Sequence, residues 1–209
     1  MQKLSFVVGV MMLLVATQAH AQGWQEFYSP EDRFVLSFPG MPTTEATEWI
    51  DQEGQARPAR RYTAERSGNT YTLTAVDFED ADYNLAHGSY DHAALVYRMK
   101  GEVTFDSWAA SDRVNGHHLQ ITLPDGRRMF FAAYYSVGRL YIIEANVSAR
   151  TAPPIQFQQS MIFLDEEGVR IRYSEDGQRL IRTDDLPESL GGPDFDAPIL
   201  EAGSDVYIP

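Results

Sequence analysis

The chain has 209 residues, of which 30 are acidic and 17 are lysine or arginine, and its formal net charge is −13. It contains no cysteine, which excludes disulfides, thiolate metal sites and a cysteine nucleophile. The acidic balance disfavours nucleic acids and anionic membrane surfaces as partners, because binding to them depends on neutralising phosphates.

The first 21 residues have the pattern of a secretory signal peptide. Lys3 supplies a positive charge, residues 4–16 are almost wholly apolar, and Ala19-His20-Ala21 is a small-x-small cleavage site. The apolar run is shorter than the ~20 residues that a membrane-spanning helix needs. Arginine outnumbers lysine 15 to 2, which favours a bacterial source. We therefore expect cleavage after Ala21, no stable membrane insertion, and a soluble protein in the periplasm or outside the cell.

The first predicted strand covers residues 34–38. Phe34, Leu36 and Phe38 alternate with other residues at a period of two, as in a strand with one face on a core. Residues 29–32, which include a proline and two acids, predict the preceding turn. Pro39 cannot donate to a sheet ladder, so Pro39-Gly40 predicts the end of the strand.

Three hairpins are predicted further along the chain. They join residues 60–66 to 70–78, residues 108–114 to 117–123 around Asn115-Gly116, and residues 128–137 to 139–147 around Gly138. Residues 128–137 are apolar on both faces of the strand, so this strand is expected at the centre of a sheet that is covered on both sides.

Two helices are predicted as the covers. Ser89 is expected to cap a helix over about residues 90–102, and Thr151 a helix over about 152–163. Pro153 and Pro154 would then lie in the first turn, where a missing N–H costs little. The predicted fold is α+β, an antiparallel sheet flanked by helices on both faces, that is, an α-β-α sandwich.

The composition changes after residue 164. Residues 165–182 are compatible with one further hairpin, whose turn would contain Glu175-Asp176-Gly177. Residues 183–209 contain seven acids, four prolines and no base. Such a segment buries too little apolar surface to offset the entropy of ordering. We therefore expect a domain over residues 22–164 and an acidic flexible tail over residues 183–209.

A resemblance supports this division. The residues that carry it are Trp24, Phe27, Ser29-Pro30, Phe34, Phe38-Pro39-Gly40, Pro42, Arg139-Leu140-Tyr141 and Gln159-Ser160-Met161-Ile162-Phe163. Through these residues, the segment from about residue 24 to residue 164 resembles the PsbP-like superfamily of small exported α+β domains. The resemblance implies an antiparallel sheet between helices, and a protein that acts by binding partners without a shared catalytic motif.

Residues 88–92 contain a serine, an acid and a histidine. Ser89 and His92 would be the nucleophile and base of a hydrolase, but such groups normally come from separate elements, and no Gly-x-Ser-x-Gly motif occurs. The alternative interpretation is that Ser89 is a helix cap.

A second candidate is a weak calcium site. Counted from Asp80, the residues Asp80, Asp82, Asn84 and Asp91 occupy positions 1, 3, 5 and 12 of a calcium loop. Leu85 stands where the loop needs glycine, and Asp91 is one carbon shorter than the usual glutamate. The alternative is a solvated acidic loop in which Asp91 favours a helix N-terminus. No cofactor other than calcium is expected.

The other polar residues give weaker indications. His87, His92, His117 and His118 lack the spacing of a zinc site, and the last two should face opposite sides of a strand. The arginines Arg57, Arg60 and Arg61 are predicted to protect an edge strand, although they could bind a carboxylate of a partner.

The leading functional hypothesis is an exported, non-enzymatic binding or accessory domain that contacts an envelope protein or a small ligand. The alternatives are a hydrolase with an unrecognised site and a weak calcium-binding structural module. A shallow surface with exposed aromatic residues such as Tyr83 or Trp108 would favour the first hypothesis.

Overall fold

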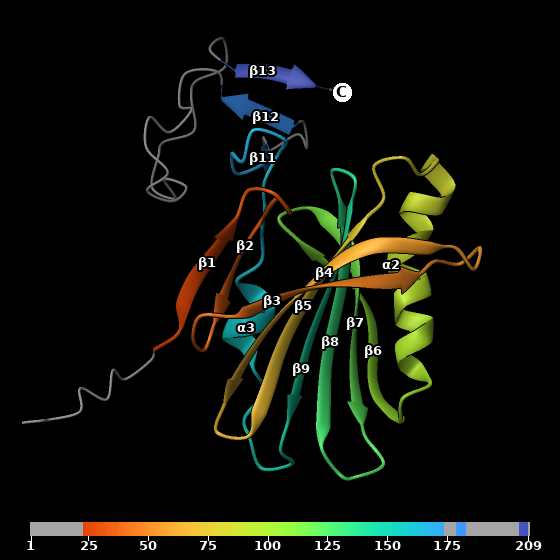
Figure 1. Cartoon of the computed structure of the whole chain (residues 1–209), viewed down its shortest axis with the longest axis vertical. Helices are drawn as coiled ribbons and strands as arrows, with labels where there is room; N and C mark the ends of the chain where they lie inside the picture. The colour runs from red at the N-terminus through yellow and green to blue at the C-terminus, as the bar shows by residue number, and fades with distance from the viewer. Residues whose placement is uncertain (1–22, 174–178, 183–204, 209) are drawn as a thin grey trace, which may run out of the picture.

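The computed structural model describes residues 23–173, 179–182 and 205–208. Its main element is a seven-stranded sheet with the order β3-β4-β5-β9-β8-β7-β6, in which every neighbouring pair is antiparallel. The strands are β3 (Thr43–Ile50), β4 (Ala56–Arg66), β5 (Asn69–Asp77), β6 (Glu102–Ser111), β7 (Val114–Thr122), β8 (Arg128–Ser136) and β9 (Arg139–Val147). Figure 1 shows this twisted sheet between α2 on one side and β1 and β2 on the other.

The helix α2 (Tyr83–Arg98) covers one face of the sheet, where it packs on β7, β8 and β9. Met129, Phe131 and Ala133 of β8 point to this face and are buried against Ala93 and Tyr97 of the helix. The alternating residues of β8 therefore supply one of the two hydrophobic cores.

The other face of the sheet is covered mainly by strands. A small sheet of β1 (Gln25–Ser29), β2 (Phe34–Phe38) and β10 (Ile162–Phe163) packs here with the short helix α3 (Ile155–Gln159). Phe34, Phe38 and Phe157 are buried with Phe130 and Tyr134 of β8. The central position predicted for β8 is confirmed, since both its faces are buried. The coarse α+β assignment holds, but this side has a three-stranded sheet and five helical residues where a full helix was predicted.

Two of the three predicted hairpins are present as predicted. In the third, the turn was predicted at the wrong residues. β4 pairs with β5, and β8 with β9, close to the predicted positions. The β6–β7 turn lies at Asp112-Arg113, whose φ angles of 47° and 62° are left-handed, and not at Asn115-Gly116. Gly116 is inside β7, where an added Cβ would come within 2.3 Å of the Ala133 carbonyl oxygen. The glycine serves close strand packing there and not a turn.

The predicted helix boundaries are also corrected. α2 begins after Asp82, whose side chain accepts the Leu85 N–H at 2.9 Å, whereas Ser89 is buried inside the helix. Glu102 begins β6 and is not helical. α3 is preceded by Pro154, and Thr151 does not cap it.

The end of the predicted second helix is a strand, because Ile162–Phe163 pair with β2 as β10. Extended pairing there buries Phe163 in the core beside Tyr141, which a solvent-facing helix end would not do.

Two further strands follow the domain. β11 (Arg172–Tyr173) pairs antiparallel with β12 (Arg179–Arg182), at the place of the predicted extra hairpin, and β12 also pairs with β13 (Asp205–Ile208). The predicted signal peptide and residues 183–204 and 209 of the predicted acidic tail lie outside the described residues. Within the described part of the chain, none of the helices has the length and apolar character required to span a bilayer.

Candidate binding surface on α2 and β6

One side of α2 carries a row of aromatic residues. Tyr83, His87 and Tyr90 are spaced i, i+4 and i+7, which places them on one side of a helix. The Tyr83 ring is stacked on His87 at 3.9 Å between centroids and is 73% exposed. His87 also contacts Tyr135 of β8, at 5.1 Å between ring centroids. The row therefore extends from the helix onto the sheet.

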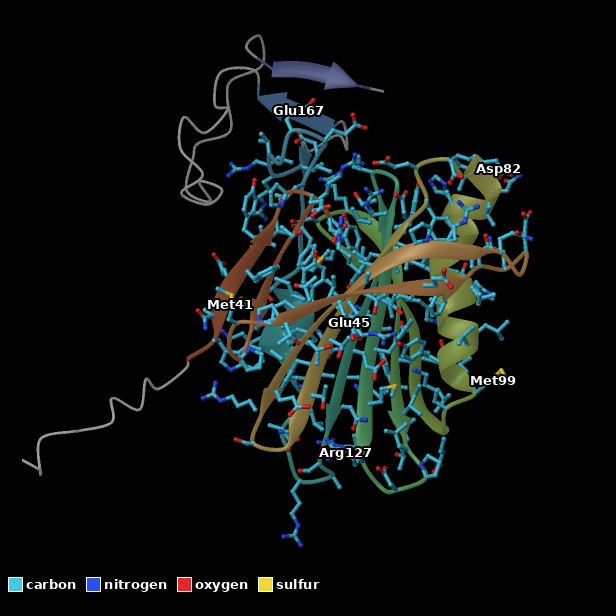
Figure 2. The ribbon with its side chains drawn as sticks, viewed as in Figure 1. Met41, Glu45, Asp82, Met99, Arg127 and Glu167 are labelled. Atoms are coloured by element: carbon cyan, nitrogen blue, oxygen red, sulfur yellow. The ribbon has the colours of Figure 1, made fainter. Side chains whose placement is uncertain are left out.

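Trp108 of β6 continues this row. Its ring is 66% exposed and lies 6.2 Å from that of Tyr90. Partial burial raises the pKa of Tyr90, and the nearby Asp91 and Tyr83 raise it further. We call the five residues Tyr83, His87, Tyr90, Trp108 and Tyr135 the aromatic surface. It runs along the N-terminal half of α2, whose two ends are marked by Asp82 and Met99 in Figure 2.

A polar cluster lies beside the aromatic surface, centred on the buried His117 of β7. The His117 Nε2 is 2.6 Å from Asp106 Oδ1 of β6, and its Nδ1 is 3.4 Å from Asp91 Oδ1 of α2. Arg98 donates to both Asp106 oxygens, at 2.7 and 3.0 Å. The His117 ring also lies 5.0 Å from that of Trp108. We call His117, Asp91, Asp106 and Arg98 the His117 cluster.

The electrostatics of the His117 cluster favour a structural role. The hydrogen bonds from Arg98 and then from His117 lower the pKa of Asp106 to about 2. Each His117 ring nitrogen faces a carboxylate, so neither is open to a substrate. Paired in this way, the cluster ties α2, β6 and β7 together and holds Trp108 in place. To act as a general base, His117 would need a ring nitrogen within hydrogen-bonding reach of the substrate proton that it removes.

The structure does not bring the proposed hydrolase residues together. The Ser89 hydroxyl is fully buried and donates to the Ala86 carbonyl oxygen at 2.6 Å. His92 lies against Trp49, and its Nε2 is 3.2 Å from the Ile50 carbonyl oxygen. The two side chains therefore have separate surroundings.

The four calcium candidates also have separate positions. Asp80 pairs with Arg57 at 2.5 Å, Asp82 caps α2, and Asp91 belongs to the His117 cluster. Asn84 lies in the first turn of α2 and is exposed. Over the ranges that the structure describes, no three His, Asp or Glu side chains are grouped as metal ligands would be.

The prediction that arginines protect an edge strand is wrong, since β4 lies between β3 and β5. Arg57 pairs with Asp51 at 2.9 Å, Arg60 with Asp32, and Arg61 with Glu45 at 3.4 Å. Cross-strand and loop carboxylates of the same chain are therefore their partners.

The predicted opposite orientation of the two neighbouring histidines is confirmed. His118 Nε2 is 2.5 Å from the Tyr134 hydroxyl, on the face of the sheet away from α2. Burial lowers the pKa of His118, and the charge of His117 lowers it further.

A shallow hollow of about 470 Å³ lies at the start of β4 and the end of β5, and its lining residues are Gln55, Ala56, Arg57, Pro58, Asp77, Glu79 and Asp80. Its carboxylates are already paired. Asp77 contacts Arg139 at 2.9 Å and Glu79 contacts Arg33 at 2.6 Å. The hollow therefore offers a cationic ligand few unpaired charges.

Sequence reasoning missed Asp106 and Arg98. The misplaced turn accounts for this, because it would pair Trp108 with Leu123, whereas the structure pairs it with His117. With the turn at Asp112-Arg113, Asp106 and Trp108 lie on one face of β6 beside His117. The sequence feature that could have indicated this cluster is the two-residue spacing of Asp106 and Trp108, which puts both on one face of a strand. It can be interpreted only when the strand register is known.

Comparison with known proteins gives matches among solved structures. No protein-family model and no curated protein sequence matches the chain. Among solved structures, it is similar to the solution structure of cyanobacterial PsbP (CyanoP) from Synechocystis sp. PCC 6803. The TM-score is 0.45 at 12% identity, over 73% of this chain and 99% of that one. At this TM-score and identity, the match says nothing of activity.

Proposed function

We propose that this protein is an exported binding or accessory module that contacts a partner protein through the aromatic surface of α2 and β6. The observation that carries the proposal is the exposure of Tyr83 and Trp108 on that surface. Tyrosine and tryptophan supply most of the binding energy at many protein interfaces.

Other apolar side chains of these elements are exposed outside the aromatic surface. They are Leu95 of α2, Met99 at its C-cap and Val103 at the start of β6, and Met99 is 85% exposed. Groups of exposed apolar residues mark interaction sites more often than isolated ones do. The surface is open, which suits a protein partner better than a small ligand that needs enclosure.

The test is quantitative capture of envelope proteins by the purified mature protein. We expect the double variant Tyr83→Ala/Trp108→Ala to lose a specific partner that the wild type retains. The matched control is Ile155→Ala, since Ile155 is an exposed apolar residue on α3, at the other face of the sheet. Melting curves of each variant check that the fold is intact.

Two outcomes would contradict the proposal. One is an identical set of captured proteins for wild type, double variant and control. The other is turnover in a panel of esterase, peptidase, phosphatase and glycosidase substrates that disappears in Ser89→Ala or His92→Ala, which would favour the hydrolase alternative.

A further inference from the structure

β6 is an outermost strand of the large sheet, and in the described residues it pairs with β7 alone. It is ten residues long and mostly exposed. A long unpaired edge presents a row of N–H and C=O groups to solvent. The other outermost strand, β3, carries two glutamates and three threonines instead of large apolar residues over most of its length.

We propose that the edge of β6 accepts an extended basic segment of the partner protein as an eighth strand of the sheet. The inference rests on the proposed function, because it specifies how the partner contacts the same surface. Addition of a peptide strand to a sheet edge is a general mode of recognition, in which backbone hydrogen bonds supply affinity and alternate side chains supply specificity.

The register of β6 indicates which of its backbone groups are not bonded to β7. The two-residue turn at Asp112-Arg113 is closed by the pair Ser111 and Val114. Such a closing pair is hydrogen-bonded, and the bonded positions then alternate along the strand. Asp106, Trp108 and Ala110 therefore direct their N–H and C=O groups away from β7. The Trp108 carbonyl oxygen also accepts the Ser107 hydroxyl at 2.9 Å, so an added strand would share or replace that bond. The pairing is regular from residue 105 to residue 111, beyond the irregularity between Val103 and Phe105.

Charge identifies the chemistry of the added strand. Asp106 lies at this edge and is partly exposed, Asp91 lies behind it, and Glu102 begins the strand. The chain as a whole carries −13. Arg98 neutralises part of this charge, since it is bound to Asp106. Lys100 and Arg113 flank the strand as further cations, and the four acids Asp91, Glu102, Asp106 and Asp112 outnumber the three cations by one. The remaining excess is negative, so lysine or arginine in the partner would be attracted, whereas a second copy of this chain would be repelled.

The aromatic surface favours the same residues. A cation on the added strand would lie near the exposed ring of Trp108, which projects on the same face of β6 as Asp106. Arginine and lysine are attracted to the faces of tryptophan and tyrosine rings. A strand with basic residues at every second position would place them all on this face.

The probe is a capped peptide of alternating arginine and valine, as long as residues 105–111, titrated into the mature protein. We expect saturable binding that weakens as salt increases, because the attraction is screened. A glutamate–valine peptide of the same length should not bind. An arginine–valine peptide with N-methyl groups on the amides of one edge should bind at least roughly fivefold more weakly, because backbone hydrogen bonds are lost.

The matched protein variants are Ala110→Pro and Ala110→Val. The first removes an outward N–H, which proline tolerates at a sheet edge, and the second keeps it. We expect the proline variant to lose affinity by roughly fivefold or more and the valine variant to retain it. If Ala110→Pro fails to fold, the N-methylated peptide still tests the backbone contact on the wild-type protein.

The results separate the two proposals. Equal binding of the N-methylated and unmodified peptides would overturn strand addition, and so would equal binding of the glutamate and arginine peptides. A wild-type dimer that dissociates in Ala110→Pro would show that a second copy occupies the edge. If envelope capture still depends on Tyr83 and Trp108 in any of these cases, the proposed function stands and the mode of contact is wrong.

Discussion

Individual carboxylates have distinct structural roles in this protein, and Asp32 is one of the buried ones. It accepts hydrogen bonds from Arg60 at 2.6 and 2.5 Å and one from the Tyr62 hydroxyl. Ser29 is 3.2 Å from the same hydroxyl. Burial, and then the hydrogen bond to Asp32, raise the pKa of Tyr62 to about 12. Asp32 was predicted only as a turn residue.

We expect Asp32→Ala to lower the free energy of unfolding by about 3 kcal/mol, because it leaves Arg60 and the buried Tyr62 hydroxyl without their acceptor. This is the low end for a buried pair, since Arg60 is partly exposed. The matched control is Glu31→Ala. Its carboxylate also contacts Arg60 but is 71% exposed, so its loss should cost less than about 1 kcal/mol. Urea denaturation measures both, and equal effects would contradict the role of burial.

Asp82 is important at the start of α2, where its carboxylate accepts the Leu85 N–H. We expect Asp82→Ala to destabilise the protein by about 1 kcal/mol, the typical cost of losing an N-cap. The measurement is thermal unfolding with and without millimolar calcium. A cap predicts the same loss in both, whereas a calcium-dependent difference between wild type and variant would support the calcium-binding alternative.

At the level of elements, the β6–β7–β8 region depends on one close approach. An added Cβ at Gly116 would lie 2.3 Å from the Ala133 carbonyl oxygen and 2.3 Å from Cδ1 of Tyr134. The backbone of β8 cannot move away without disturbing its pairing with β9, because β8 is central. The glycine thus allows β7 to carry His117 and β6 to carry Trp108 in the observed register.

We expect Gly116→Ala to destabilise the fold by about 1–3 kcal/mol through overpacking. Asn115→Ala is the control, since Asn115 is exposed in the same strand and should change stability by less than about 0.5 kcal/mol. Chemical denaturation measures both variants. A Gly116→Ala protein as stable as the control would show that β7 and β8 separate easily.

On the scale of the whole molecule, a single sheet separates two hydrophobic cores, and each core contains buried tyrosines. Tyr141 and Tyr134 lie in the core on the β2 side, and Tyr97 lies in the core under α2. Burial raises the pKa of Tyr134 to about 12 and that of Tyr97 and Tyr141 well above the ordinary value. The folded state therefore requires these tyrosines to stay in their neutral, protonated form in both cores.

Alkaline pH should therefore unfold the protein. A raised folded-state pKa means that stability is complete below pH 10, the ordinary tyrosine value, and is lost as pH rises through about 12. In this range the unfolded chain ionises first. Absorbance of tyrosinate and circular dichroism should change together in one steep transition. Tyrosine ionisation that is complete before any loss of secondary structure would contradict this expectation.

The sequence alone determined those strands whose own residues carry a recognisable pattern. The period of two in residues 34–38, and the two apolar faces of residues 128–137, predicted β2 and the central position of β8, because alternation is a property of the strand itself. The hairpin at Gly138 was also predictable, since its turn needs the left-handed conformation that glycine adopts easily.

The tertiary structure decided what depended on competition between distant segments. Gly116 had two uses, a turn or a close contact, and only the neighbouring β8 selects the second. Asp82 and Ser89 could both cap a helix, and burial of Leu85 and Ala86 on the sheet favours the earlier start. The His117 cluster joins α2, β6 and β7, so it exists only once the register of the sheet is set. Exposure of Tyr83 and Trp108 likewise depends on which side chains are left over after the two cores are filled, and no local pattern reports that.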